Sequence, residues 1–278
     1  MRRFLAFFIA LALLPLAASA APPPDGSVWY YASDTMTIDI ALVQKQLNKR
    51  EKLAYFVADI RIQDPSQLRS AFATGTYNID AEEETAAIAR RSNAVIAING
   101  DYCNHKNNKR SGIIIRDGIA YRDRSWSRDL MYIDAQGNMH IVLRDERENL
   151  TAEILMEQGT MQSFEFGPAL IRDGEALAMP HTYFVSTVRG LREPRTGIGQ
   201  IGPLHYLLLV ADGRRKGWSD KGMTFQEMQE VFLEYDCQNA YNLDGGGSST
   251  LFFCDQVLNC VAWRGTQRLI SDIVYFID

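Results

Sequence analysis

Short apolar segments alternate with Gly, Pro and Asp-Gly turns along most of the chain, a pattern typical of a fold built largely from strands. Residues 53–62 (LAYFVADIRI) alternate in polarity, whereas residues 93–98 (NAVIAI) are continuously apolar, as in a strand buried on both faces. Further strands are expected at 28–31, 38–43, 169–171, 183–188, 197–201, 206–210 and 240–243, with hairpins over 112–143 and two or three strands at the end of the chain.

Helix signals are fewer. Asp80, followed by acidic residues, predicts a helix that runs to about residue 91, and residues 151–157 predict a second, shorter one. The third signal is the strongest, because Thr224 and Glu227 form a capping box ahead of one apolar stripe that ends at Tyr235. Strands outnumber helices, and no repeat or internal linker is visible. We therefore expect a single-domain α+β fold, with a mixed sheet and a few packed helices, over residues 28–278.

The N-terminus has the pattern of an export signal. Two arginines precede an apolar run, which ends in the small residues Ala18-Ser19-Ala20. Residues 1–20 are accordingly predicted to be a signal peptide cleaved near Ala20, and residues 21–27, with three prolines, to be a flexible lead-in. The mature protein is expected to be secreted or periplasmic. No later apolar run approaches the roughly 18 residues of a membrane helix, so no membrane insertion of the mature chain is expected.

The net charge and the number of cysteines indicate which partners the protein can bind and whether it contains disulfides. The formal net charge of −5 argues against nucleic acid as a general partner. Four cysteines in an exported chain indicate two disulfides, with three possible connectivities. Cys254 and Cys260 enclose five residues, which suggests a staple across a hairpin loop and leaves Cys103 to pair with Cys237. A zinc site is disfavoured, because no C-x-x-C pair is present.

The sharpest local feature is residues 242–250 (NLDGGGSST), directly after a predicted buried strand. Three consecutive glycines cost backbone entropy and are useful where the chain must turn through positive φ or let a ligand approach. Their N–H groups and the serine hydroxyls can form a concave set of donors for a phosphate or sugar oxygen. A tight turn between two strands is the simpler interpretation, but it needs only one or two such residues.

These residues also carry a family resemblance. From about Ala94 to the end, the chain is similar to the phosphodiester glycosidase family, with the motifs in the family's order: AVIAINGDY (94–102), GIIIRDG (112–118), FGPALIRDGE (166–175), PRTGIG (194–199), ADGR (211–214), GMTFQEMQEVF (222–232) and NLDGGGSST (242–250). The chain departs from the family where Gly100-Asp101-Tyr102-Cys103 replaces a second glycine and aromatic residues.

The resemblance implies an exported hydrolase that cleaves a sugar from a sugar-1-phosphodiester at the anomeric carbon. The products are free sugar and a phosphomonoester, and the substrate is a phosphate-linked glycan or a small sugar-phosphodiester. A phosphate monoester leaves readily, so the demanding tasks are to hold the anion and to stabilise an oxocarbenium-like transition state. Arginines, backbone donors and at least one carboxylate near C1 serve those tasks.

The predicted site follows from these needs. Asp244 is the leading catalytic carboxylate, and Asp101 and Asp212, each at a predicted strand end, are its possible partners. The predicted substrate-binding residues are Asn99, Gly100, Arg195, Thr196, Arg214, Asn242, Gly245, Gly246, Gly247, Ser248, Ser249 and Arg268. Arg195 is the first choice for the phosphate, because its planar fork matches two phosphate oxygens.

Two other functions stay open at this level. A non-catalytic protein for glycan binding or exopolysaccharide assembly would keep the same pocket without needing a carboxylate at C1. A metal-dependent phosphodiesterase would instead cleave on the phosphorus side, but the clusters of metal ligands that this reaction uses are missing from the sequence. No cofactor is expected, although the carboxylates and carbonyls around Asp244 are groups that could hold a divalent ion. The sequence does not indicate an oligomeric state.

Overall fold

The computed structural model describes residues 28–101, 112–124, 128–179, 191–261 and 265–278. The expected signal peptide, the lead-in and the strand expected at 183–188 lie outside these residues. The largest sheet has eight strands, in the order β1 (Val28–Ala32), β2 (Met36–Gln46), β3 (Lys52–Ile62), β15 (His205–Ala211), β14 (Arg195–Gly202), β16 (Asn239–Asn242), β12 (Ala169–Arg172) and β13 (Glu175–Ala176).

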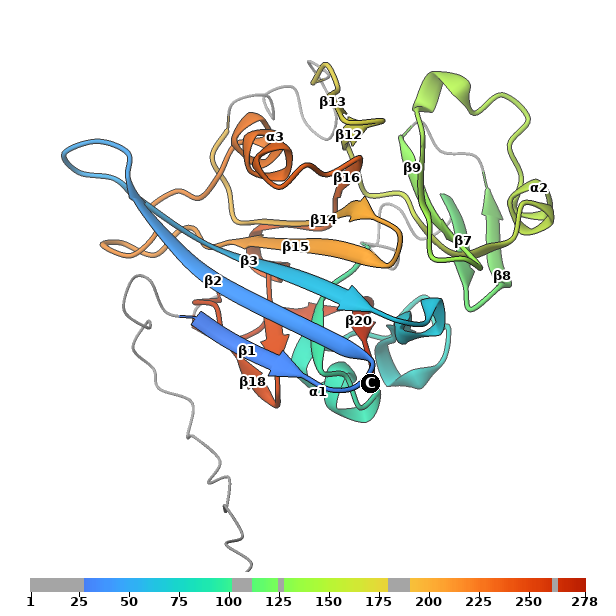
Figure 1. The fold of residues 1–278 in the computed structure, drawn as a ribbon, viewed down its shortest axis with the longest axis horizontal. Coiled ribbons are helices and arrows are strands. Elements are labelled where there is room, and N and C mark those ends of the chain that lie inside the picture. Colours follow the sequence, from blue (N-terminus) through green and yellow to red (C-terminus); the bar gives the residue numbers. More distant parts are fainter. Residues whose placement is uncertain (1–27, 102–111, 125–127, 180–190, 262–264) are drawn as a thin grey trace, which may run out of the picture.

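The other strands form smaller sheets (Figure 1). A five-stranded sheet has the order β18 (Gln256–Val257), β17 (Leu251–Phe253), β6 (Ile96–Asn99), β20 (Asp272–Phe276) and β4 (Leu68–Phe72). A three-stranded sheet contains β10 (Met139–Val142), β9 (Leu130–Asp134) and β11 (Thr160–Phe164). Two ribbons pair β19 (Leu269–Ile270) with β5 (Glu83–Glu84) and β7 (Gly112–Arg116) with β8 (Ile119–Arg124).

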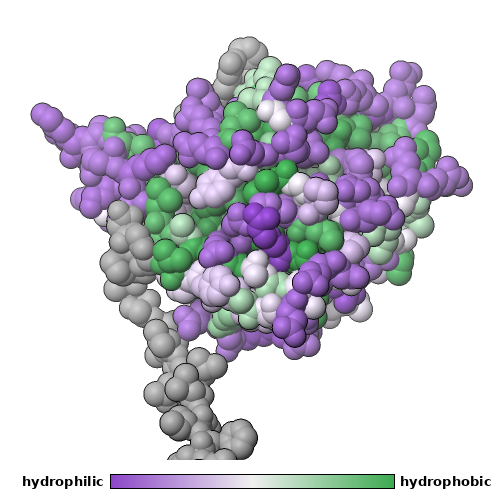
Figure 2. All heavy atoms as spheres, in the orientation of Figure 1, coloured by the Kyte–Doolittle hydropathy of each residue, from purple (hydrophilic) through white to green (hydrophobic). Residues whose placement is uncertain are grey.

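The main core lies between the eight-stranded and five-stranded sheets. Alternate residues of each strand point into it, such as Ile38 and Phe56 from one sheet and Ile98 and Val274 from the other. The opposite face of the large sheet packs against α3 (Phe225–Glu234), and that of the five-stranded sheet packs against α1 (Thr85–Arg91). Helix α2 (Ala152–Glu157) packs beside β7 and β8. The β2–β3 hairpin projects from this body and has a hydrophilic tip (Figure 2).

The α+β class is confirmed, and the sequence located most elements. Helix α3 begins as predicted, because the Thr224 hydroxyl accepts from the Glu227 N–H at 3.1 Å and the Glu227 carboxylate accepts from the Thr224 N–H at 2.9 Å. Two expectations need correction. Every strand pair in the described residues is antiparallel, rather than mixed. Helix α1 starts at Thr85 instead of near Asp80, because Glu83 and Glu84 pair with β19.

The predicted Cys254–Cys260 disulfide is absent from the structure, where both residues are free thiols. Cys254 and Asp255 form the two-residue turn between β17 and β18, each with positive φ. Leu258 pairs with Leu251, so the chain is already about 10 Å from the turn before it reaches Cys260. A disulfide needs Cα atoms within about 7 Å.

Of the other predicted pair, Cys103 and Cys237, the structure describes only Cys237. Cys237 is a buried thiol, and burial raises its pKa to about 12. Its proposed partner, Cys103, lies outside the described residues. Among the helices that are described, none is long and apolar enough to cross a membrane.

Glycines on β14 allow α3 to approach the sheet, and this gives a test of the packing. A Cβ on Gly199 would lie 2.9 Å from the Cys237 sulfur and 2.9 Å from a ring carbon of Phe232. We expect Gly199→Ala to lower the free energy of unfolding by about 1–3 kcal/mol through overpacking, measured by urea denaturation. Gly202→Ala on the same strand is the control, because nothing lies within 4 Å of its Cβ position. Equal stability of the two variants would contradict the close packing.

Candidate functional site

Several polar segments meet at one edge of the two main sheets, where β6 and β16 end and β14 and β20 begin. The Asp244 N–H donates to the Gly100 carbonyl at 3.2 Å, which joins the segment after β16 to the segment after β6. The Gly246 N–H donates to the Pro194 carbonyl at 2.8 Å, which adds the start of β14. The edge therefore brings together three motifs that are about 50 to 150 residues apart in the sequence.

Asn99 fixes this junction. Its Nδ2 donates to the Asp244 carbonyl at 2.6 Å, and its Oδ1 accepts from the Thr196 hydroxyl at 2.8 Å and from the Thr250 N–H at 3.2 Å. The side chains of Asn99, Thr196 and Thr250 are fully buried or nearly so. The Asn99 amide is thus occupied by the protein, and its role in the structure is to hold the main chain at Asp244. The Thr196 hydroxyl is occupied in the same way.

The carboxyl group of Asp244 is buried beside the glycine-rich loop. Burial raises its pKa to about 6, with a smaller contribution from the charge of Asp272. The Ser248 side chain, the charge of Arg268 and the Gly245 N–H act in the opposite direction and favour the ionised form. Asp244 is therefore mostly a carboxylate above pH 6, with a cationic side chain close enough to act on it.

Close main-chain approach explains one glycine of this loop, and positive φ explains a second. A Cβ on Gly245 would lie 2.7 Å from the Pro194 carbonyl oxygen. Gly246 has a φ of +65°, a conformation that favours glycine. The loop continues through Gly247 and Ser248, both buried, and the buried Ser249 Oγ has no hydrogen-bond partner among the described residues.

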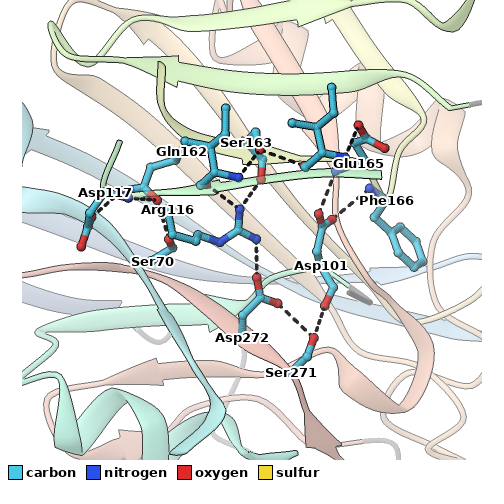
Figure 3. Close-up of polar contacts among 12 residues, drawn as sticks. Ser70, Asp101, Arg116, Asp117, Gln162, Ser163, Glu165, Phe166, Ser271 and Asp272 are labelled. Carbon is cyan, nitrogen blue, oxygen red and sulfur yellow. Dashed lines mark hydrogen bonds and ion pairs between the residues drawn. The ribbon is translucent and has the colours of Figure 1, made fainter. Parts of the chain in front are cut away.

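Asp101 is the second buried carboxyl group at this edge. Its two oxygens accept from the N–H groups of Glu165 and Phe166, at 2.8 and 2.9 Å (Figure 3). Burial, and then the charge of Asp272, raise the pKa of Asp101 to about 7. Asn242, at the end of β16, is bound to the same loop, because its Nδ2 donates to the Gly167 carbonyl at 2.7 Å. Its buried Oδ1 has no partner among the described residues.

Asp212, the third predicted carboxylate, has a different environment. One of its oxygens accepts from Trp218 Nε1 at 2.8 Å and from the Cys260 N–H at 3.0 Å, and the other accepts from Asn259 Nδ2 at 2.9 Å. Asn259 in turn donates to the Ser249 carbonyl at 3.0 Å. Burial raises the pKa of Asp212 to about 6. Its hydrogen bonds brace the end of the glycine-rich loop.

The predicted arginines have unequal access to the loop. Arg195 is buried: it donates to the carbonyls of Met223 and Leu191, and its guanidinium lies 3.9 Å from the centre of the Phe225 ring. Burial lowers its pKa to about 10. Its main chain is close to the loop, but its side chain points to the α3 side of the sheet, away from Thr196.

Arg214 is half exposed and lies over the loop instead. Its Nη2 is 3.5 Å from the position that a Cβ on Gly246 would take. Two of its nitrogens contact one oxygen of Glu193, at 2.9 and 2.6 Å. Arg214, rather than Arg195, therefore presents an accessible guanidinium beside the glycine-rich loop.

Two charged residues of the site are missing from the sequence-based set. Asp272 and Arg116 form a buried ion pair at 2.5 Å, and a Cβ on Gly100 would lie 2.9 Å from an Asp272 oxygen. The available signal was a charge at one end of an otherwise apolar strand, in GIIIR for Arg116 and in DIVYF for Asp272. Within the described part of the chain, no cluster of three or more His, Cys, Asp or Glu side chains is arranged to hold a metal ion.

Comparison with known proteins gives a consistent result. A model of the phosphodiester glycosidase family matches residues 92–277. The SPbeta prophage-derived uncharacterized protein YomE of Bacillus subtilis is 30% identical over 212 residues, which cover 73% of this chain and 31% of that protein. The bovine N-acetylglucosamine-1-phosphodiester alpha-N-acetylglucosaminidase is 26% identical over 179 residues, which cover 60% of this chain and 32% of the enzyme. The chain thus spans about a third of the length of these relatives.

The fold also has a solved counterpart. The catalytic domain of the zebrafish N-acetylglucosamine-1-phosphodiester alpha-N-acetylglucosaminidase, auto-inhibited by its pro-peptide, superimposes with a TM-score of 0.71. The superposition covers 88% of this chain and 84% of that domain, at 18% sequence identity. At this identity, the likeness establishes a shared fold.

The hydrogen bonds of Asn99 give a test of the junction. We expect Thr196→Val to lower the free energy of unfolding by about 1–2 kcal/mol, because it removes a buried hydroxyl donor from Asn99 Oδ1. Thr196→Ser keeps the hydroxyl and is the control. Urea denaturation of both variants measures the difference. If the valine variant is as stable as the serine variant, the hydroxyl does not support the junction.

Proposed function

Because the chain belongs to the phosphodiester glycosidase family, we propose that it hydrolyses the bond between C1 of a sugar and the oxygen of a phosphodiester. The hydroxyl of a water ends on C1, and the phosphate leaves as a monoester with the bridging oxygen and its electron pair. The proposed substrate is a phosphate-linked glycan or a small sugar-phosphodiester. From the N-terminal pattern, we also propose that the protein acts after export.

The observation that carries this proposal is the combination of groups at one strand edge. A glycine-rich loop with an arginine over it, Arg214, lies next to two buried carboxyl groups, Asp244 and Asp101. The loop N–H groups and a guanidinium suit a phosphate, which is anionic and has several acceptor oxygens. A carboxylate in a buried site stabilises the positive charge that develops at C1 as the bond breaks.

We assign the roles accordingly. Asp244 faces C1 as the ionised carboxylate, with Asp101 as its partner. Arg214 and the loop at residues 245–249 bind the phosphate, and Arg268 adds positive charge near Asp244. Other predicted residues hold the site in place. Asn99, Thr196 and Asp212 brace the junction and the loop, and Arg195 anchors the start of β14.

The reaction is tested by identifying products from a panel of sugar-1-phosphodiesters. We expect free sugar and a phosphomonoester, and we expect Asp244→Asn to lower kcat by about 10²-fold or more, because it removes the charge beside C1. Asp145→Asn is the matched control, since its side chain is 85% exposed. Turnover by Asp244→Asn at the wild-type rate would remove the assignment. Saturable binding without turnover by the wild-type protein would instead favour a glycan-binding protein.

Substitution of Arg214 and of Arg195 is expected to have different effects. Arg214→Gln should raise KM by about tenfold or more with little change in stability, because the side chain is half exposed and its ion pair with Glu193 lies at the surface. Arg195→Gln should instead lower the melting temperature, because the buried guanidinium stacks on Phe225 and binds two carbonyls. Steady-state kinetics and thermal unfolding of both variants decide the matter. The opposite pattern would show that Arg195, rather than Arg214, binds the phosphate.

A further inference from the structure

The ion pair of Arg116 and Asp272 is buried at the same edge, and Arg116 makes further contacts there (Figure 3). Its side chains are 3% and 0% exposed. Beyond Asp272, the Arg116 guanidinium donates to the carbonyls of Ile115 and Ser163 and lies 4.2 Å from the centre of the Phe164 ring. Arg116 therefore stabilises the charge of Asp272 from a fixed position.

Asp272 also lies against the main chain that leads into Asp101. The Gly100 N–H donates to the Asp272 carbonyl at 2.9 Å, and a side chain at Gly100 would collide with the Asp272 carboxylate. The Ser271 hydroxyl is 3.0 Å from the Asp101 carbonyl and 3.3 Å from an Asp272 carboxylate oxygen. Asp272 is thus close enough for its charge to act on the carboxyl group of Asp101.

The charges at this edge do not balance. Asp101, Asp244 and Asp272 are three buried carboxyl groups, and Arg116 forms an ion pair with Asp272. Among the described residues, no lysine or arginine forms an ion pair with Asp101 or Asp244.

The charged groups that act on Asp101 come from three elements: Asp272 on β20, Arg116 on β7 and Glu165 after β11. Glu165 has its own buried partner, Arg147, at 2.5 Å. Arg268 acts on Asp244 through its charge, and three neighbouring carboxyl groups share one ion pair, so we expect one of them to keep a proton near neutral pH.

We propose that Asp272 is a positioning residue, and that its ion pair with Arg116 assigns the proton of this cluster to Asp101, which makes Asp101 the proton donor to the phosphate. This role rests on the proposed function, because it takes a sugar-phosphodiester as the substrate. Burial raises the pKa of Asp272, and the Arg116 guanidinium bound to it acts in the opposite direction and favours its ionised form. Its negative charge then opposes a second charge on Asp101, while Asp244, beside Arg268, takes the ionised form that C1 requires.

The substrate needs this distribution of charge. A phosphodiester is an anion, and it would be repelled by three carboxylates, whereas a protonated Asp101 offers it a hydrogen bond. When the C1–O bond breaks, its electron pair goes to the bridging oxygen, and Asp101 gives its proton to the phosphate. A water supplies the hydroxyl on C1, and its other proton restores Asp101. The pKa values support the order of the two groups, because that of Asp101 lies at about 7 and that of Asp244 at about 6.

The pH dependence of kcat/KM tests the proposal. We expect a bell-shaped profile, with an acid limb near pH 6 where Asp244 loses its charge and a basic limb near pH 7 where Asp101 loses its proton. Asp272→Asn removes the charge that holds the proton, so the basic limb should move to lower pH by about one unit or more. A basic limb that stays in place in Asp272→Asn would overturn the role of Asp272.

Asp117→Asn is the matched control. Asp117 follows Arg116 directly, but its carboxylate binds Arg69 and Gln162 at 2.9 and 2.7 Å, outside the cluster. This variant should keep the wild-type profile. If it moves the basic limb as far as Asp272→Asn does, the effect is a general response of the hairpin, and the proposal fails.

A measurement without substrate separates this proposal from the proposed function. In protein labelled with ¹³C at aspartate carboxyl groups, the signal lost in Asp101→Asn identifies Asp101, and its shift is followed against pH. We expect the Asp101 carboxyl group of the wild-type protein to titrate near pH 7. If Asp272→Asn does not fold, Arg116→Lys takes its place, and because this variant keeps a cation beside Asp272, we expect Asp101 to titrate near neutral pH there as well. Titration near pH 4 in the wild-type protein would overturn the proposal whether or not any sugar-phosphodiester is cleaved.

Discussion

The hydrogen bonds of Asn99 join the two main sheets at the edge where the polar segments collect. Asn99 ends β6 of the five-stranded sheet, and its amide binds Thr196 of the eight-stranded sheet and the main chain of Asp244. A buried amide that loses one of these partners is costly, since no water replaces it. The position of the glycine-rich loop therefore depends on the way the sheets pack, although the loop itself is local in sequence.

The same packing sets the electrostatics of the edge. The sheets exclude water from the strand ends, so the carboxyl groups placed there have raised pKa values, with burial as the main cause for Asp101, Asp212 and Asp244. What differs between them is the set of partners. Asp212 has donors on both oxygens and braces the loop, whereas Asp244 has the Gly245 N–H of its own loop. Asp101 has two main-chain donors and a negative neighbour.

Local signals in the sequence were reliable where short-range physics decides the conformation. The capping box at Thr224 and the alternation over β3 both depend on residues a few positions apart, and both elements form as predicted. The helix expected from Asp80 began later, because pairing of Glu83 and Glu84 with β19, some 185 residues away, competes with the first helical turn. The cysteine spacing failed for a related reason, since a two-residue turn at Cys254 moves Cys260 out of reach.

Patterns along the chain are enough to predict the strand-rich α+β fold, the family, and the motifs that end at one sheet edge, because alternation, caps and glycine runs act through near neighbours. The direction in which each side chain points from that edge depends instead on how the sheets pack. Arg195 and Thr196 are consecutive on one strand and so lie on opposite faces, which removes Arg195 from the loop and leaves Arg214 over it. The pairing of Asp272 with Arg116 across 156 residues was likewise settled by packing, because a buried charge takes the partner that the fold brings to it.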